Sequence, residues 1–172
     1  MFERFKRLLG GDRNPSADSV EPKKNAVRSV AGDIVELQKN AVKSVAGDIV
    51  DLQDGDWDDR EWVYIAVNHE VSPEEGGRSS TQARVLAKKP GGELENLGFR
   101  LSQSTKQRLL VLRDAMAPGA VDPWTVLDLT IERSGHYDFN FSYTPPPRLN
   151  GDLLHAPLSN LLERYLTKRA DR

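Results

Sequence analysis

Residues 124–143, WTVLDLTIERSGHYDFNFSY, form the stretch that decides the fold. Apolar and polar residues alternate through both halves of this stretch, and Ser134-Gly135 separates the halves. Alternation with a period of two is typical of a β-strand that buries one face, and a glycine between two such runs indicates a turn. The stretch therefore predicts a β-hairpin with one apolar and one polar face.

The pairing across this hairpin follows from the need to bring the apolar side chains of both strands to one side. A loop of Ser134, Gly135 and His136 predicts three apolar pairs: Ile131 with Phe139, Leu129 with Phe141 and Leu127 with Tyr143. A two-residue loop would mix the two faces, because a shift of one residue turns every side chain over. One misfit remains, since three-residue loops usually carry their glycine last.

The opposite face of the hairpin is polar and acidic. Its six side chains are Asp128, Thr130, Glu132, Asp138, Asn140 and Ser142. The predicted pairing sets Glu132 opposite Asp138, which is mildly repulsive. A solvated sheet face explains this pattern, because many antiparallel sheets keep one face in water. A surface for a partner is the alternative.

An internal duplication precedes the sheet. KNAVRSVAGDIVELQ at residues 24–38 is followed directly by KNAVKSVAGDIVDLQ at residues 39–53, with differences at only two positions. Apolar residues at helical spacing continue from one copy into the next, which predicts a duplicated amphipathic helix. We expect the second copy to fill a core position. The first copy is then redundant, or it pairs with another chain in a homo-oligomer.

Further strands and helices are predicted around the hairpin. The segments 62–71 and 81–89 are typical of strands, and a short third strand ends near Phe99. In the first strand, alternation places Trp62 on the face opposite Ile65. Ser104-x-x-Gln107 predicts a capping box that opens a helix, and apolar residues between 158 and 166 predict a helix after a run of three prolines.

The order of these elements carries a family resemblance. The pattern W-x-x-L-x-L-x-I…G-x-Y-x-F-x-F-x-Y is made by Trp124, Leu127, Leu129, Ile131, Gly135, Tyr137, Phe139, Phe141 and Tyr143, with Trp57, Trp62 and Tyr64 upstream. Over roughly residues 39–143 the chain resembles the YezG-like family of bacterial antitoxin or immunity proteins. The resemblance implies a protein that binds and neutralises a cognate secreted toxin, often a nuclease, and has no catalytic activity.

An acidic cluster lies before the first predicted strand. The positions that we assign to a partner surface here are Asp54, Asp56, Trp57, Asp58, Asp59 and Glu61. A solvated loop would explain these charges. A surface that meets the lysines and arginines of a nuclease, and so speeds the encounter, is the alternative. The resemblance favours this alternative, and Asp128, Glu132 and Asp138 of the hairpin extend the predicted surface.

Composition narrows the possible partners and compartments. Of the 172 residues, 38% are hydrophobic and 29% are charged, with a formal net charge of −2. Nucleic-acid-binding domains are typically basic, so we expect no direct nucleic-acid partner. The chain has no cysteine, which fits a reducing cytoplasm and removes disulfides and zinc–thiolate sites. We expect no secretion signal and no membrane partner.

Local motifs for catalysis or metal binding are not evident in the sequence. The three histidines, His69, His136 and His155, do not have the spacing of metal ligands. Neither a G-x-S-x-G motif nor a phosphate-binding glycine loop occurs. We therefore expect no cofactor, no metal and no catalytic residue.

These observations together predict an α+β fold. We expect an antiparallel sheet of about four or five strands with helices packed on one face, preceded by the duplicated helix. Residues 1–23 are predicted to be a flexible segment, residues 24–53 the repeat, and residues 39–172 a single domain that includes the C-terminal helix. The expected function is that of an immunity protein that occludes a toxin. The alternatives are a self-association scaffold built on residues 24–53 and an enzyme of unidentified type.

Overall fold

The structure is a computed structural model that describes residues 21–56, 59–74, 77–117 and 122–170. For residues 21–34 and 56 it describes the backbone alone. The predictions made for residues 1–20, for Trp57 and for Asp58 lie outside the described residues.

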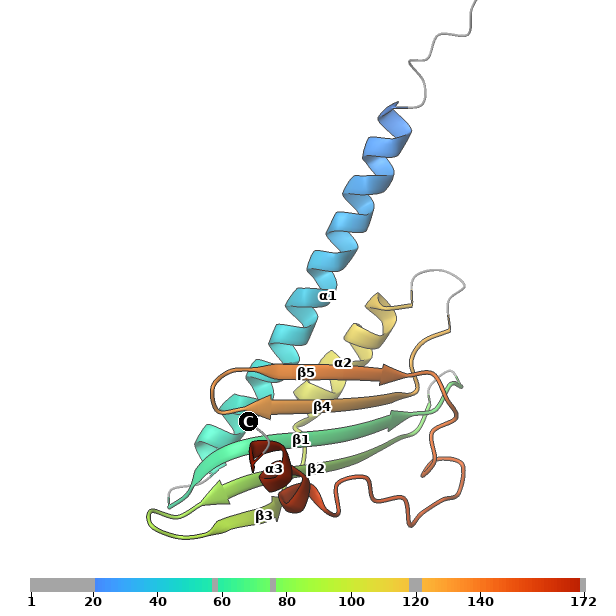
Figure 1. Cartoon of the computed structure of the whole chain (residues 1–172). Helices are drawn as coiled ribbons and strands as arrows, with labels where there is room; N and C mark the ends of the chain where they lie inside the picture. Colours follow the sequence, from blue (N-terminus) through green and yellow to red (C-terminus); the bar gives the residue numbers. More distant parts are fainter. Residues whose placement is uncertain (1–20, 57–58, 75–76, 118–121, 171–172) are drawn as a thin grey trace, which may run out of the picture. The chain divides into compact units, whose positions relative to one another are not determined.

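Three helices and five strands make up the described part of the chain (Figure 1). In chain order they are α1 (Glu21–Asp56), β1 (Glu61–Val71), β2 (Ser79–Lys88), β3 (Leu94–Gly98), α2 (Gln103–Ala115), β4 (Val126–Glu132), β5 (Tyr137–Ser142) and α3 (Leu161–Ala170). All four strand pairs are antiparallel, in the order β3-β2-β1-β4-β5. The predicted α+β fold with an antiparallel sheet is therefore confirmed.

The chain divides into two compact units, residues 1–35 and 36–172. The boundary lies inside α1, so that residues 21–35 of this helix belong to the first unit and residues 36–56 to the second. The sheet, α2 and α3 all belong to the second unit. None of the helices in the described ranges is both long and apolar enough to cross a membrane.

The central hairpin forms where it was predicted, but its register differs from the prediction by two residues. Its apolar pairs are Ile131 with Tyr137, Leu129 with Phe139 and Leu127 with Phe141. Gly135, not His136, is the last residue of the loop, because the Glu132 N–H donates to the His136 carbonyl at 2.7 Å. The predicted pairs were therefore wrong, although a shift of two residues leaves every side chain on the predicted face.

The correct register removes two difficulties of the prediction. Gly135 has a φ of +86°, the left-handed conformation that the last position of a three-residue loop requires. Asp138 lies opposite Thr130 and not opposite Glu132, so the expected repulsion is absent from the hairpin. Tyr143, predicted to lie on the apolar underside, follows the end of β5 and is exposed.

One face of the sheet carries the main core. Val45 and Ile49 from residues 36–56 of α1, and Leu109 of α2, pack with Ile65 and other apolar residues of the sheet. Trp62 also lies in this core, against the prediction that it faces away from Ile65. A β-bulge between Trp62 and Tyr64 is the reason, because one extra residue reverses the alternation.

The N-cap of α2 lies two residues before the predicted one. Ser102, and not Ser104, is the N-cap, since its Oγ accepts a hydrogen bond from the Thr105 N–H at 3.0 Å. The predicted capping box was therefore placed two residues too late. The Ser104 Oγ lies 2.9 Å from the Ser102 Oγ, within hydrogen-bonding distance of the N-cap side chain.

The second face of the sheet is partly covered by the C-terminal segment. Leu158 and Leu161 pack on Tyr64, Ala66 and Leu86 of β1 and β2. Figure 1 shows α3 in front of the sheet, beside β1, β2 and β3, while α2 lies behind it. Helices thus cover both faces and not only one, and the polar side of β4 and β5 is left largely open.

Candidate partner-binding surface

The open surface is the polar side of the β4–β5 hairpin. Asp138 and Asn140 on β5 are exposed, and Asp128, Thr130 and Glu132 on β4 are half-buried. These side chains point to the same face because the register pairs Asp128 with Asn140 and Thr130 with Asp138. The three hairpin carboxylates of the predicted site therefore share one face.

Asp128 is the most constrained of these carboxylates. Its Oδ1 accepts a hydrogen bond from the Asn68 side-chain amide of β1 at 2.7 Å. Asn68 is buried, so this contact fixes the position of Asp128 at the inner margin of the open surface. Asp138 lies on the outermost strand, and it provides the more accessible charge.

Two carboxylates of the acidic cluster, Asp54 and Asp59, pair with cations of the same chain. Asp54 accepts hydrogen bonds from the Trp62 indole N–H and from Arg133 Nη1, both at 2.6 Å. The hydrogen bond from Trp62, followed by that from Arg133, lowers the pKa of Asp54 below its ordinary value. The Arg133 guanidinium also lies 4.6 Å from the centre of the Trp62 ring, a cation–π distance.

Asp59 is neutralised in the same way. Its carboxylate lies 3.2 Å from Lys89 Nζ and 2.7 Å from Arg60 Nη1. The hydrogen bond from Lys89 is the main reason why the pKa of Asp59 is lowered. Arg60 also donates to Glu95 of β3 at 2.9 Å, and this contact raises the pKa of its guanidinium.

The structure thus brings the predicted site residues into two groups. Asp54 lies at the end of the sheet where Arg133 joins α1 to the hairpin turn, and exposed Glu61 begins β1. Asp56 lies in the last turn of α1. Asp128, Glu132 and Asp138 form the second group, on the polar face of the hairpin. Sequence reasoning missed Lys89 and Arg133, because residues that pair only in the folded chain leave no local signal. It also missed Arg60, the sequence neighbour of Asp59.

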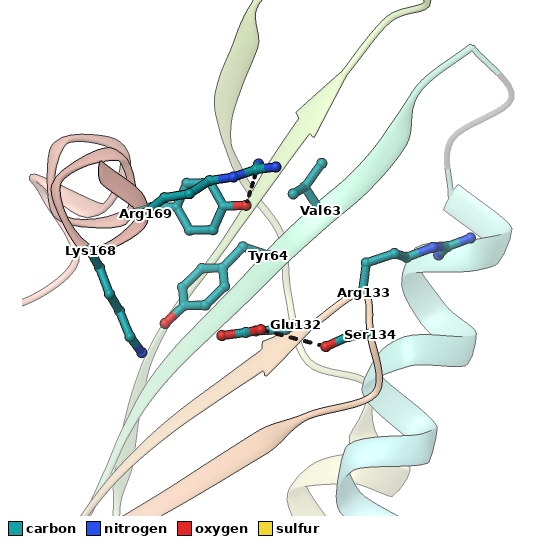
Figure 2. Close-up of a pocket in the computed structure, with 8 residues that line it drawn as sticks. Val63, Tyr64, Glu132, Arg133, Ser134, Lys168 and Arg169 are labelled. Carbon is teal, nitrogen blue, oxygen red and sulfur yellow. Dashed lines mark hydrogen bonds between the residues drawn. The ribbon is translucent and has the colours of Figure 1, made fainter. Parts of the chain in front are cut away.

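A cleft adjoins the open surface on the side of α3 (Figure 2). It has a volume of about 280 Å³ and is lined by Val63, Tyr64, Glu132, Arg133, Ser134, Tyr165, Lys168 and Arg169. The rings of Tyr64 and Tyr165 lie 5.1 Å apart, and Arg169 Nη1 donates to the Tyr165 hydroxyl at 3.2 Å. The apolar spacing of α3 predicted a buried stripe, but it did not indicate which sheet face the helix covers.

The charges around this cleft have both signs. Lys168 and Arg169 stand on the α3 side, and Glu132 stands on the β4 side, as Figure 2 shows. A second cleft of about 400 Å³ continues along Asp128 and Thr130 towards Arg164 of α3. The surface therefore offers carboxylates on the hairpin, cations on α3, and a tyrosine pair between them.

A buried ion pair holds the chain that leads to α3. Glu70 is fully buried, and its Oε1 lies 3.3 Å from Arg148 Nη1. Glu70 Oε2 also accepts the backbone N–H groups of Arg148 at 2.9 Å and Leu149 at 3.2 Å. Arg148 Nε donates to Ser80 Oγ at 2.8 Å. Burial lowers the pKa of Arg148, and the charge of Glu70 opposes this effect.

Metal binding receives no support from the geometry of the described residues. No three histidine, aspartate or glutamate side chains within the described ranges lie close enough together to hold a metal ion. His69 is buried against Trp124, with ring centres 6.4 Å apart, and its Nδ1 lies 2.7 Å from Thr81 Oγ1.

Comparison with known proteins does not assign a family. Neither the family models scanned nor the curated proteins searched match the chain.

Proposed function

We propose that this protein is an immunity protein that binds a cognate toxin domain and blocks it by occlusion, without catalysis of its own. The observation that carries the proposal is the open polar face of β4 and β5. On this face Asp128 lies opposite the amide of Asn140, and Asp138 lies opposite the hydroxyl of Thr130. The resemblance to YezG-like proteins gives the class of partner.

The form of this surface supports recognition of a protein. It is a hairpin face flanked by clefts of about 280 and 400 Å³. Partner surfaces that meet such a face are recognised through complementary charge and through aromatic side chains at the centre of the contact. Tyr64 is already buried, so half-buried Tyr165 is the aromatic side chain of the cleft that a contact across the hairpin and α3 would cover further.

The ion pairs within the chain indicate which carboxylates are available for a contact with the toxin. Asp54 and Asp59 already have cationic partners in the chain, so they act mainly by holding the α1–β1 junction and the turns beside it. Asp138 and Asp128 are the charges that we assign to the toxin. A basic patch, typical of a nuclease that binds phosphates, is the complementary feature.

Co-expression with the toxin encoded beside the gene tests the proposal. We expect the wild-type chain to rescue growth and to co-purify with the toxin. The variant Asp128→Lys/Asp138→Lys should lose both effects, because it reverses the charge of the open face. Asp152→Lys is the matched control, since Asp152 is an exposed carboxylate outside this face.

Two results would refute the proposed function. One is the absence of rescue and of a complex with the wild-type chain. The other is full rescue by the Asp128→Lys/Asp138→Lys variant, which would show that the toxin binds elsewhere. Circular dichroism of each purified variant separates a lost contact from a lost fold.

A further inference from the structure

The outer edge of β5 has hydrogen-bonding groups that the sheet does not use. β5 is the terminal strand in the order β3-β2-β1-β4-β5. In an antiparallel pair, the backbone groups of successive residues point alternately towards the partner strand and away from it. His136 accepts from Glu132 of β4, and therefore the N–H and C=O groups of Tyr137, Phe139 and Phe141 point away from β4.

β5 carries few of the devices that usually protect such an edge. Natural edge strands avoid pairing through lysine, proline, a bulge or a covering element. Residues 137–142, YDFNFS, contain neither lysine nor proline, and the β4–β5 register continues without a bulge. Asp138 is the only charged residue of the strand.

Along the same edge, Tyr137, Phe139 and Phe141 form a row of half-buried aromatic side chains that ends at the fully buried Trp124. The ring centres are 5.9 Å apart between Tyr137 and Phe139, 6.1 Å between Phe139 and Phe141, and 5.6 Å between Phe141 and Trp124. The three β5 side chains pack against the main core and remain partly exposed. A strand that joined the edge would bring its own side chains against this row and remove more of it from water.

We propose that β5 pairs antiparallel with β5 of a second copy of the chain, with Phe139 on the two-fold axis. This register sets Asp138 opposite Asn140 of the second copy, and Tyr137 opposite Phe141 of the second copy. The strand is therefore complementary to itself: each carboxylate faces an amide and not another carboxylate, and each aromatic residue faces an aromatic residue.

The direction of the backbone N–H and C=O groups agrees with this register. Pairing about Phe139 joins Tyr137, Phe139 and Phe141 of one copy to the same residues of the other, and these are the residues whose backbone groups point outward. An isologous contact closes after two copies. It therefore pairs the outward N–H and C=O groups of both β5 strands without forming a fibre. The two sheets become one continuous sheet, and the open polar faces become neighbours.

Exchange of charges across the two-fold axis tests this dimer. The solution mass of the wild type should be twice the chain mass of 19.2 kDa. Asn140→Asp places two carboxylate pairs across the axis and should raise the dimer dissociation constant on the order of tenfold. Asp138→Lys/Asn140→Lys should weaken the dimer similarly through two ammonium pairs. An equimolar mixture of these two variants should restore the dimer, because both pairs become opposite in charge.

Thr130→Asp provides the matched control. Thr130 lies opposite Asp138 within the hairpin, so this change adds a similar carboxylate pair inside one chain without altering the proposed contact. It should therefore leave the dimer intact. Light scattering over a concentration series, with circular dichroism of each variant, measures all five samples.

Three results would overturn the inference. A wild type with the mass of a single chain at every concentration would mean that the edge of β5 stays unpaired or serves another protein. Variants that all remain dimeric would locate self-association elsewhere, for example in the helix of residues 24–53. A mixture that stays monomeric would show that charge across the axis does not control the contact. None of these results depends on toxin binding.

Discussion

Gly135 is the residue that fixes the register of the central hairpin. Its φ of +86° lies in the left-handed region, which glycine adopts without the strain caused by a Cβ atom. A loop that ends on this residue consists of Arg133, Ser134 and Gly135, and it sets Leu129 against Phe139. The chain therefore selects a register in which both turn geometry and face polarity are satisfied.

Replacement of Gly135 by alanine isolates this backbone effect. An added Cβ would meet nothing within 4 Å, so the cost is conformational and not steric. We expect Gly135→Ala to lower the free energy of unfolding by about 1–2 kcal/mol. Gly47→Ala is the control: Gly47 is exposed in α1, has open space around it, and should gain about 0.5–1 kcal/mol. Urea denaturation measures both variants, and an unchanged Gly135→Ala stability would contradict the argument.

His69 makes the stability of the fold depend on pH. Burial lowers its pKa from 6.5 to about 4, and the nearby charges of Lys106 and Arg148 act in the same direction. The unfolded chain takes up a proton near pH 6.5, whereas the folded chain does so only near pH 4. The free energy of unfolding should therefore fall as the pH decreases through this interval and then level off.

The size of this effect is about 3.5 kcal/mol, at about 1.4 kcal/mol for each of the roughly 2.5 pH units that separate the two pKa values. Denaturation at a series of pH values between 7 and 4 measures it. His69→Gln should flatten the curve in this interval, even if the variant is less stable at pH 7. A curve for His69→Gln that is as steep as that of the wild type would refute the assignment.

At the scale of elements, the ion pair between Glu70 and Arg148 anchors the segment that leads into α3. Loss of one member of a buried pair leaves the other charged and unpaired, which costs about 3–5 kcal/mol. We expect Arg148→Met to lose stability on this scale and to expose residues 144–155 to proteases. The double variant Arg148→Met/Glu70→Gln should recover part of the loss, because glutamine is neutral and still accepts the two backbone N–H groups.

The two variants are compared by urea denaturation and limited proteolysis. Arg164→Met removes an exposed arginine from α3 and serves as the control, with an expected change within about 0.5 kcal/mol. A double variant that is no more stable than Arg148→Met alone would show that the charge on Glu70 is not the source of the loss.

The duplicated helix is the second feature at this scale. Val45 and Ile49 of the second copy are fully buried, whereas Val35 and Leu37 at the end of the first copy are exposed. Deletion of residues 24–38 should therefore leave cooperative thermal unfolding intact, since the second copy fills the core position. A broad transition after this deletion would mean that the first copy supplies part of the core.

At the scale of the whole molecule, the distribution of charge predicts how the proposed complex should form. Exposed charges on complementary surfaces mainly accelerate association, and salt screens them. We expect the association rate constant with the toxin to fall as ionic strength rises. Asp138→Asn should reduce this rate more than it increases the dissociation rate. Surface plasmon resonance measures both rates, with Asp152→Asn as the control. An association rate that is independent of salt would count against electrostatic recognition.

The sequence by itself determined the class of the fold and the location of its hairpin. Alternation and helical spacing are local properties of the chain, so the strands around Leu129, Ile65 and Val85 and the helix around Leu109 could be identified from neighbouring residues alone. The polarity of each hairpin face was correct for the same reason. Even an error of two residues in the register could not change it.

Only the tertiary structure decided which segments meet. The bulge that turns Trp62 into the core, the face that α3 covers, and the pairing of Asp54 with Arg133 and of Asp59 with Lys89 all depend on residues far apart in the sequence. Such contacts form because burial and charge pairing are satisfied over the whole fold at once, and a local pattern carries no record of the partner. The site was therefore predictable as a set of acidic residues, but the division between paired and open charges was not.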